Sequence, residues 1–243
     1  MGGHSLVATW RTNFDCVFPT QYWYCIKDGR FDLQSLRAKE RYEINKGIKN
    51  FYVKLINIEQ YETALYDVYV ESLKGYQNTT QLDSSSFIRR LKTLLGMSDD
   101  SYLFGVFDKK TNNLCGFSNL YCKDRYIELT QLRTRVSCEK MNVNFALVYG
   151  ILEFFSNDLE RGCYICDGVR NSYHKTNFQN YLERYFGFRK AYCKLHVEFR
   201  QPFKLIFLSL FPFRRLLKNK RNKYLSQLYS CLTMYAWSLG YPE

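Results

Sequence analysis

The clearest structural signal in the sequence is a set of three short β segments in the middle of the chain. Residues 102–107 are apolar, residues 108–113 form a polar turn cluster, and residues 114–121 form the returning segment. A second turn leads to residues 126–133, in which apolar and polar residues alternate. Short turns between consecutive strands predict an antiparallel meander. A chain that contains this meander must cover the apolar side of its sheet.

The segments around the meander supply the covering helices. Residues 59–76 and 84–96 precede it and carry apolar residues at helical spacing. Residues 143–155 follow it as a strongly apolar helix. Further elements predicted towards the N-terminus are strands at 6–10 and 22–27, a helix from its N-cap Asp32 to Gly47, and a strand at 51–57.

Residues 162–192 contain the largest number of chemically capable side chains. A short apolar run at 163–166 predicts a buried strand, and a polar loop separates it from a helix that starts at 178 and ends at Gly187. One strand is predicted at 189–199. Ligands often bind at strand ends in sheets that are flanked by helices. The sequence therefore places a candidate site in the loop after residue 166.

Composition restricts the class of partner. The 243 residues include 35 basic and 23 acidic side chains, which gives a net charge of +12. Such an excess favours an anionic partner, which is a nucleic acid, a phosphate-bearing cofactor or a membrane surface. The hydrophobic fraction of 46% excludes global disorder. Cys163 and Cys166 form the only CxxC pair, and because no second pair has zinc spacing, we expect two ordinary strand cysteines and no metal.

The last part of the chain differs in character. Residues 203–213 are almost entirely apolar, and residues 200–223 contain eight Lys or Arg and no Asp or Glu. The apolar run is too short to span a bilayer. Two interpretations stay open, an amphipathic segment on a membrane surface and a C-terminal helix packed on its domain. The nine cysteines, interpreted as reduced thiols, and the absence of a signal-peptide pattern predict a cytoplasmic protein.

Two blocks of sequence resemble a known family. The first is Leu36-Arg-Ala-Lys-Glu-Arg-Tyr-Glu-Ile-Asn-Lys-Gly-Ile-Lys-Asn-Phe-Tyr-Val53. The second is Ile165-Cys-Asp-Gly-Val-Arg170 with His174, Thr176-Asn-Phe178 and Tyr185-Phe-Gly-Phe-Arg-Lys190. They resemble the Fem-type branch of the GNAT acyltransferase superfamily and related proteins of bacterial surface-polysaccharide loci. The resemblance implies an α/β (α+β) fold with a mixed central sheet, an antiparallel meander and flanking helices. Three parts of the chain are expected. Residues 1–50 would be a remnant of a first Fem-type half, residues 51–200 would form the GNAT-like domain, and residues 201–243 would form a basic helical tail.

The resemblance also implies an acyl donor, which is acetyl-CoA or another acyl-CoA, with aminoacyl-tRNA as the alternative. The superfamily binds the donor's phosphates in a glycine-rich loop between its fourth strand and the next helix. The corresponding stretch here, residues 132–142, contains no glycine, although backbone amides at a helix start can still bind phosphate. The expected cofactor-binding residues are Arg133, Arg135, Ser137 and Asn142.

Acyl transfer requires a base, donors for the carbonyl oxygen and a site for the acyl donor. His174 is the predicted base because it titrates near neutral pH, and Asp167 either orients it or acts itself. The alternative is a turn-capping aspartate with a surface histidine. Glu128 is a third candidate, if it is half-buried in its strand rather than at an exposed sheet edge. The expected substrate-binding residues are Arg170, Asn171, Thr176 and Asn177.

Together these features predict an acyltransferase that moves an acetyl or aminoacyl group directly onto an amine or hydroxyl. As the resemblance implies, the acceptor is an amino sugar or a small-molecule or lipid-linked glycan precursor of the cell envelope. Residues 203–223 would hold the protein at the inner face of the membrane. Two rivals remain: a protein that binds tRNA or another nucleic acid through its positive charge, and a catalytically inactive scaffold with this fold.

Overall fold

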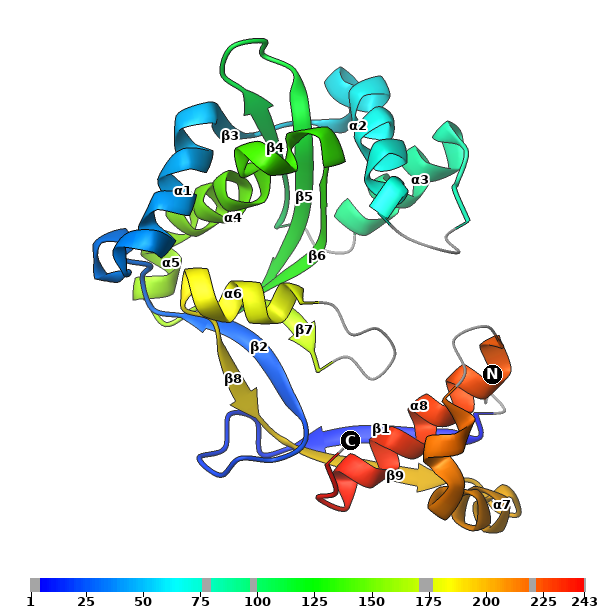
Figure 1. Ribbon diagram of the computed structural model, residues 1–243. Coiled ribbons are helices and arrows are strands. Elements are labelled where there is room, and N and C mark those ends of the chain that lie inside the picture. The colour runs from blue at the N-terminus through cyan, green and yellow to red at the C-terminus, as the bar shows by residue number, and fades with distance from the viewer. Residues whose placement is uncertain (1–4, 76–79, 97–99, 171–176, 219–221, 243) are drawn as a thin grey trace. The chain divides into compact units, whose positions relative to one another are not determined.

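The computed structural model describes residues 5–75, 80–96, 100–170, 177–218 and 222–242. Contacts divide the chain into two units (Figure 1). Unit 1 consists of residues 1–26, 168–180 and 189–243, and unit 2 of residues 27–167 and 181–188. Each unit therefore consists of several separate segments of the chain, whereas the sequence predicted three domains that are each continuous in sequence. The predicted boundaries at residues 50 and 200 stay a prediction.

The central sheet is mixed and contains seven strands in the order β3-β4-β5-β6-β7-β2-β8. Strands β3 to β6 pair antiparallel, and β6 and β7 pair parallel. The predicted meander is therefore confirmed as β4, β5 and β6. A separate antiparallel pair joins β1 and β9. The strands are β1 Val7–Thr12, β2 Trp23–Asp28, β3 Phe51–Leu55, β4 Ser101–Asp108, β5 Leu114–Lys123, β6 Tyr126–Thr134, β7 Tyr164–Val169, β8 Arg189–Tyr192 and β9 Lys194–Phe199.

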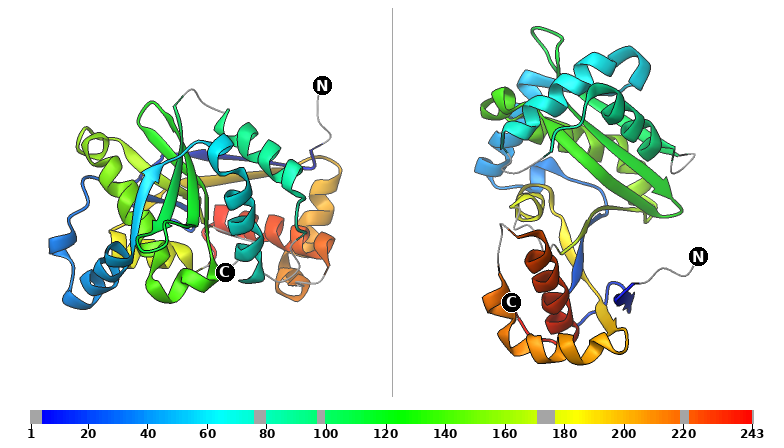
Figure 2. Two further views of the ribbon diagram at one scale, coloured as in Figure 1. Left: turned by 90° about the horizontal axis from the view of Figure 1, so that it is seen from above. Right: turned by 90° about the vertical axis from the view of Figure 1, so that its right-hand side faces the viewer.

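The helices of unit 2 cover both faces of its strands (Figure 2). On one face, Leu65 of α2 and Phe87 of α3 share a buried cluster with Phe117 of β5. On the other face, α4 packs against β3, β4 and β5, and α1 packs against α4. The helices of unit 2 are α1 Ala38–Asn50, α2 Ile58–Ser72, α3 Ser84–Leu95, α4 Val143–Phe154, α5 Ser156–Glu160 and α6 Phe178–Phe186, whose first three residues belong to unit 1. The 3-10 helices of unit 2 are η1 Leu33–Ser35, η2 Leu73–Gly75 and η3 Val136–Met141.

Unit 1 has its own apolar cluster, formed where the C-terminal helices cover the β1–β9 pair. Leu195 and Phe199 of β9 and Leu232 and Trp237 of the last helix are buried together. The helices that surround them are α7 Phe203–Leu210, η4 Phe211–Leu217 and α8 Lys223–Ser238. The residues after 200 therefore complete a packed core.

Two predicted elements were wrong in detail. The Asp32 side chain caps the short η1, accepting from the Gln34 N–H at 2.8 Å, and α1 begins only at Ala38 because Leu36 and Arg37 are extended. The single strand predicted at 189–199 is β8 and β9, which belong to different sheets. The break is at Cys193, whose N–H donates to the Tyr22 carbonyl at 3.0 Å. A change of partner strand leaves the alternation of apolar residues intact, so the sequence does not show it.

Gly47 of α1 allows the close approach of α1 to α4. A Cβ at this position would lie 2.6 Å from the Asn142 carbonyl oxygen and 2.9 Å from the Ala146 nitrogen, both of which are backbone atoms. We expect Gly47→Ala to lower the free energy of unfolding by about 2 kcal/mol, because overpacking outweighs the gain in helix propensity. Urea unfolding measures the loss. The control is Gly96→Ala, since the nearest atom would lie at 3.4 Å there. Equal stability of the two variants would contradict this prediction.

Candidate active site

A carboxylate and two tyrosines form a polar cluster on β5 and β6 in unit 2. Glu128 lies directly opposite Tyr121 in the strand register. The Tyr121 hydroxyl donates to Glu128 Oε2 at 2.8 Å, and the Tyr126 hydroxyl donates to the same oxygen. Among the residues that the structure describes, none donates a hydrogen bond to the second oxygen, Oε1. The two tyrosines thus fix the carboxylate through one of its two oxygens.

The environment of Tyr121 keeps its hydroxyl protonated. Burial and the neighbouring Glu128 carboxylate raise the pKa of Tyr121 to about 12. A hydroxyl with this pKa remains a hydrogen-bond donor at neutral pH. Glu128 is half-buried rather than exposed at a sheet edge. The position of Glu128 therefore fits the first of the two sequence-based interpretations, although its catalytic role stays a prediction.

A β-bulge next to Glu128 adds a buried amide to the cluster. The register passes from Leu120–Leu129 to Asn119–Gln131, so Thr130 is the extra residue of β6. Thr130 accepts from the Asn119 side-chain amide and donates to the Asn119 carbonyl at 2.9 Å. Asn119 is 1% exposed, and in the described part of the chain its Oδ1 has no hydrogen-bond partner. A buried acceptor without a donor costs about 1–3 kcal/mol.

The cluster lies on the α2–α3 face of the sheet, where β6 and β7 stop pairing. Asn119 and Tyr121 follow Phe117 at intervals of two residues, and Phe117 packs against α2 and α3. Within the described residues, the β6–β7 ladder ends at the pair Glu128–Cys166, although β6 continues to residue 134 and β7 to residue 169. Beyond Glu128, the edge of β6 that faces β7 is not used in this ladder. Backbone groups at such an edge can bind an extended acyl group.

The structure separates the two predicted catalytic carboxylates. Cys166 is the residue opposite Glu128 in the parallel register, so the next residue, Asp167, is directed to the other face of the sheet. His174, together with Asn171 and Thr176, lies outside the described residues. Asn177 is exposed immediately before α6. The catalytic assignments of His174 and Asp167 therefore stay predictions.

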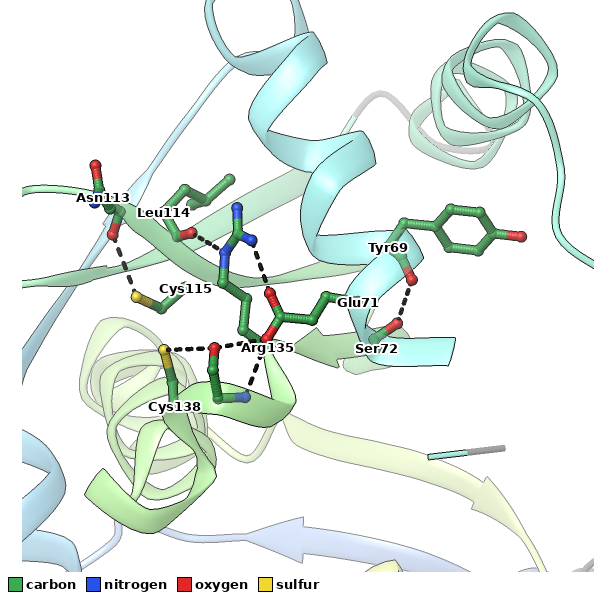
Figure 3. A network of polar contacts seen from close by, with 9 residues as sticks. Tyr69, Glu71, Ser72, Asn113, Leu114, Cys115, Arg135 and Cys138 are labelled. Atoms are coloured by element: carbon green, nitrogen blue, oxygen red, sulfur yellow. Dashed lines mark hydrogen bonds and ion pairs between the residues drawn. The ribbon is translucent and has the colours of Figure 1, made fainter. Parts of the chain in front are cut away.

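The stretch after β6 that was expected to bind phosphate is hydrogen-bonded to carboxylates of the protein itself, and Figure 3 shows the contacts with Glu71. The Arg135 guanidinium donates to Glu71 Oε2 at 2.9 Å. The Ser137 backbone N–H and hydroxyl donate to Glu71 Oε1 at 3.0 and 2.6 Å. The Asn142 side chain donates to the Glu43 carboxylate at 2.7 Å and to its carbonyl at 2.9 Å. Three of the four expected cofactor-binding residues thus already bind an acidic residue, and Arg133 lies on β6 opposite Phe117.

These bonds stabilise the ionised form of Glu71. Hydrogen bonds from Ser137 and the charge of Arg135 outweigh the cost of burial and lower the pKa of Glu71 to about 2. The Glu71 side chain is 17% exposed, so solvent screens this interaction only partly. At neutral pH the Arg135 and Ser137 donors at the start of η3 are therefore hydrogen-bonded to an ionised carboxylate.

Arg170, a predicted substrate-binding residue, has a packed position in unit 1. Its guanidinium lies 4.5 Å from the Trp23 ring centre and 4.1 Å from the Trp237 ring centre. Its Nη1 also donates to the Gln21 carbonyl at 2.7 Å. Stacking between two indoles holds the end of β7 in place, as cation–π contacts do elsewhere. A role for Arg170 in binding substrate stays a prediction.

The remaining features of the described residues bear on metals and membranes. No group of three or more His, Cys, Asp or Glu side chains there is arranged to hold a metal ion. Within the same residues, no helix combines the length and the apolar character that crossing a bilayer requires. An open hollow of about 810 Å³ on unit 2 is lined by side chains of α2 and α3, among them Glu62, Arg89 and Lys92. Glu128 and Asn119 do not line it.

Comparison with known proteins identifies the fold. No family model matches the sequence, and no curated protein matches it. FemX is similar in structure, with a TM-score of 0.54 and 10% identity over 73% of this chain and 60% of FemX. L-PGS from Bacillus licheniformis gives a TM-score of 0.50 and 11% identity over 88% of this chain and 68% of that one. The C-terminal domain of a putative lysylphosphatidylglycerol synthetase from Agrobacterium fabrum gives a TM-score of 0.51 and 10% identity over 85% of this chain and 67% of that one. The predicted fold is confirmed.

Proposed function

We propose that this chain, which has the Fem-type, GNAT-like fold of FemX and L-PGS, is an acyltransferase with Glu128 as its catalytic base. The observation that carries the proposal is the Glu128 cluster. A half-buried carboxylate is bound through one oxygen by Tyr121 and Tyr126, beside the point where β6 and β7 stop pairing. General bases need a fixed position within reach of the acceptor proton.

The proposed reaction transfers the acyl group in one displacement. The acceptor nitrogen or oxygen attacks the acyl carbonyl carbon, and Glu128 Oε1 takes the proton that the acceptor loses. The bond that breaks joins the carbonyl carbon to the sulfur or ribose oxygen of the donor. The leaving group then takes the proton that Glu128 removed from the acceptor, which returns Glu128 to its carboxylate form. Backbone N–H groups of β6 beyond Glu128 stabilise the carbonyl oxygen as it becomes negative.

The Glu71 contacts favour aminoacyl-tRNA over acyl-CoA as the donor. Coenzyme A carries a pyrophosphate, which in the GNAT fold binds at the helix start after the fourth strand. Here Glu71 already binds the Ser137 N–H and the Arg135 guanidinium at that place. A pyrophosphate would have to displace a carboxylate held by three hydrogen bonds. Aminoacyl-tRNA needs no pyrophosphate there, and the net charge of +12 favours tRNA.

The proposed acceptor is an amine or hydroxyl of a lipid-linked or glycan precursor of the cell envelope. The Fem-type fold supports this proposal, as does the similar domain of Agrobacterium fabrum, whose name describes a lysyl group on phosphatidylglycerol. A glycan amine and a lipid hydroxyl require the same base chemistry. The choice between them is therefore left to the assay.

Ligand-dependent stability tests the donor, and transfer of label tests the activity. We expect saturating charged tRNA to raise the melting temperature by about 5 °C or more, since a ligand at a hundredfold its Kd adds about 2.7 kcal/mol. Coenzyme A at millimolar concentration should leave the melting temperature within about 1 °C. Labelled aminoacyl-tRNA should then transfer its amino acid to lipid-linked precursors.

The controls separate the donor from the activity. Uncharged tRNA measures binding that does not depend on the acyl group. A clear shift with acetyl-CoA together with acetyl transfer would reverse the choice of donor and keep the acyltransferase. Binding of tRNA without transfer to any acceptor would favour the alternative that the protein only binds nucleic acid. Neither binding nor transfer would favour the inactive scaffold.

A further inference from the structure

The segment formed by α7 and η4 in unit 1 is fixed by its inner side chains. Phe207 stacks on Phe199 of β9 with ring centres 4.3 Å apart. Phe211 meets Tyr235 of α8 edge-on with ring centres 5.2 Å apart. Leu210 and Leu217 also pack against the cluster of unit 1. The side chains on the other side of this segment are therefore held at the surface by the fold.

The outer side of this segment is apolar. Leu205 is 73% exposed and Leu216 is 82% exposed. Three more large apolar side chains are exposed in the same fifteen residues, Phe203, Ile206 and Phe213. Single exposed apolar residues are common, but several together on one short segment mark an interaction surface. We call these five residues and their basic neighbours the α7–η4 surface.

The charge of the α7–η4 surface is positive. Lys204, Arg214, Arg215 and Lys218 belong to it, and the sequence from 200 to 223 contains no acidic residue. Arg214 packs over the Phe211 ring at 4.6 Å, so its position is fixed by the core. Lys204 lies 3.6 Å from Glu198 of β9 in an exposed pair, and such pairs are weak. The other three basic side chains keep the surface positive.

We propose that the α7–η4 surface binds the surface of an anionic lipid bilayer, with its axis in the plane of the membrane. The exposed apolar side chains enter the boundary between headgroups and acyl chains, and the basic side chains contact lipid phosphates. Eight residues of α7 and seven of η4 are too short to span a bilayer. A nucleic acid would pair with the charges but would leave Leu205 and Leu216 in water. The proposal does not depend on the acyltransferase activity.

Vesicle co-sedimentation of the full chain tests the proposal. We expect binding to vesicles of phosphatidylcholine with phosphatidylglycerol, and much weaker binding to phosphatidylcholine alone. The double variant Leu205→Ser, Leu216→Ser should bind about a hundredfold more weakly, with about tenfold for each leucine. The matched control is Leu55→Ser, Leu239→Ser, because these leucines are 45% and 51% exposed elsewhere on the molecule. It should bind within about twofold of the wild type.

A charge variant separates lipid from nucleic acid. Arg215→Gln, Lys218→Gln should weaken vesicle binding about tenfold or more at low salt, since each basic residue near an anionic surface contributes about fivefold. Unchanged melting temperatures of both double variants would show that the fold is intact. Vesicle binding that is insensitive to Leu205 and Leu216, or equal for neutral and anionic vesicles, would overturn the proposal. Loss of oligonucleotide binding in the charge variant, with no vesicle binding by the wild type, would assign the surface to nucleic acid.

Discussion

Glu128→Gln is expected to reduce kcat for acyl transfer by about 10²- to 10⁴-fold, which is the usual contribution of a positioned general base. The amide keeps the size of the carboxylate and still accepts hydrogen bonds from Tyr121 and Tyr126, so the strands stay paired. It cannot take the acceptor proton at Oε1. Binding of the donor, measured by the shift in melting temperature, should stay within about twofold of the wild type.

Two further variants define the role of the cluster around Glu128. Tyr121→Phe removes one hydrogen bond to Oε2, and we expect a smaller loss of kcat, about tenfold, because Tyr126 still holds the carboxylate. Glu139→Gln is the matched control, since Glu139 is an exposed carboxylate in the same unit. Full activity of Glu128→Gln would remove Glu128 from the mechanism and direct attention to His174.

Glu71→Gln is expected to lower the free energy of unfolding by about 3 kcal/mol at neutral pH, because it removes one partner of a mostly buried ion pair. Arg135 would keep its charge without the carboxylate, and Ser137 would lose an ionised acceptor. Urea unfolding measures the change. Glu62→Gln is the control, because Glu62 and Lys92 pair at 3.0 Å with both side chains nearly half exposed, and such pairs contribute about 1 kcal/mol or less.

The wild type and the Glu71→Gln variant should also differ in how their stability depends on pH. The pKa of Glu71 is about 2 in the folded protein and 4.5 is its ordinary value, so the unfolded state binds the proton more tightly. The stabilisation by Glu71 is therefore complete above pH 4.5 and is lost as the pH falls towards 2. The difference in stability between wild type and Glu71→Gln should shrink over this range. A difference that stays constant down to the folded-state pKa would show that Glu71 stabilises by packing rather than by charge.

Local patterns predicted most of the fold. The alternation in the meander and the helical spacing around it depend on neighbouring residues, so they are visible in one sequence. The break at Cys193 is not visible in this way. It depends on Tyr22, 171 residues away in the chain, and on two different partner strands. Sequence periodicity reports that a strand is buried but not which strand it pairs with.

The candidate site was predictable only in part. Glu128 was a candidate because a carboxylate in the middle of a predicted strand would be half-buried. Tyr121 and Asn119 were missed, since nothing separates them from the other 20 tyrosines or from ordinary strand residues until the register is known. Glu71 is 64 residues from Arg135, and no local pattern connects them. Arg135 and Ser137 were therefore assigned to phosphate binding without the carboxylate that binds them.

The pairing of β1 with β9 has a consequence for how the protein folds during synthesis. Val7 pairs with Phe199, so the first strand meets its partner only after nearly the whole chain has been made. Unit 2, by contrast, consists mainly of the uninterrupted stretch 27–167. Contacts between distant residues form slowly because a long loop must close first. We therefore expect the acyltransferase strands to assemble at the ribosome while β1 is still unpaired, which makes an early nascent chain dependent on whatever shields that strand from aggregation.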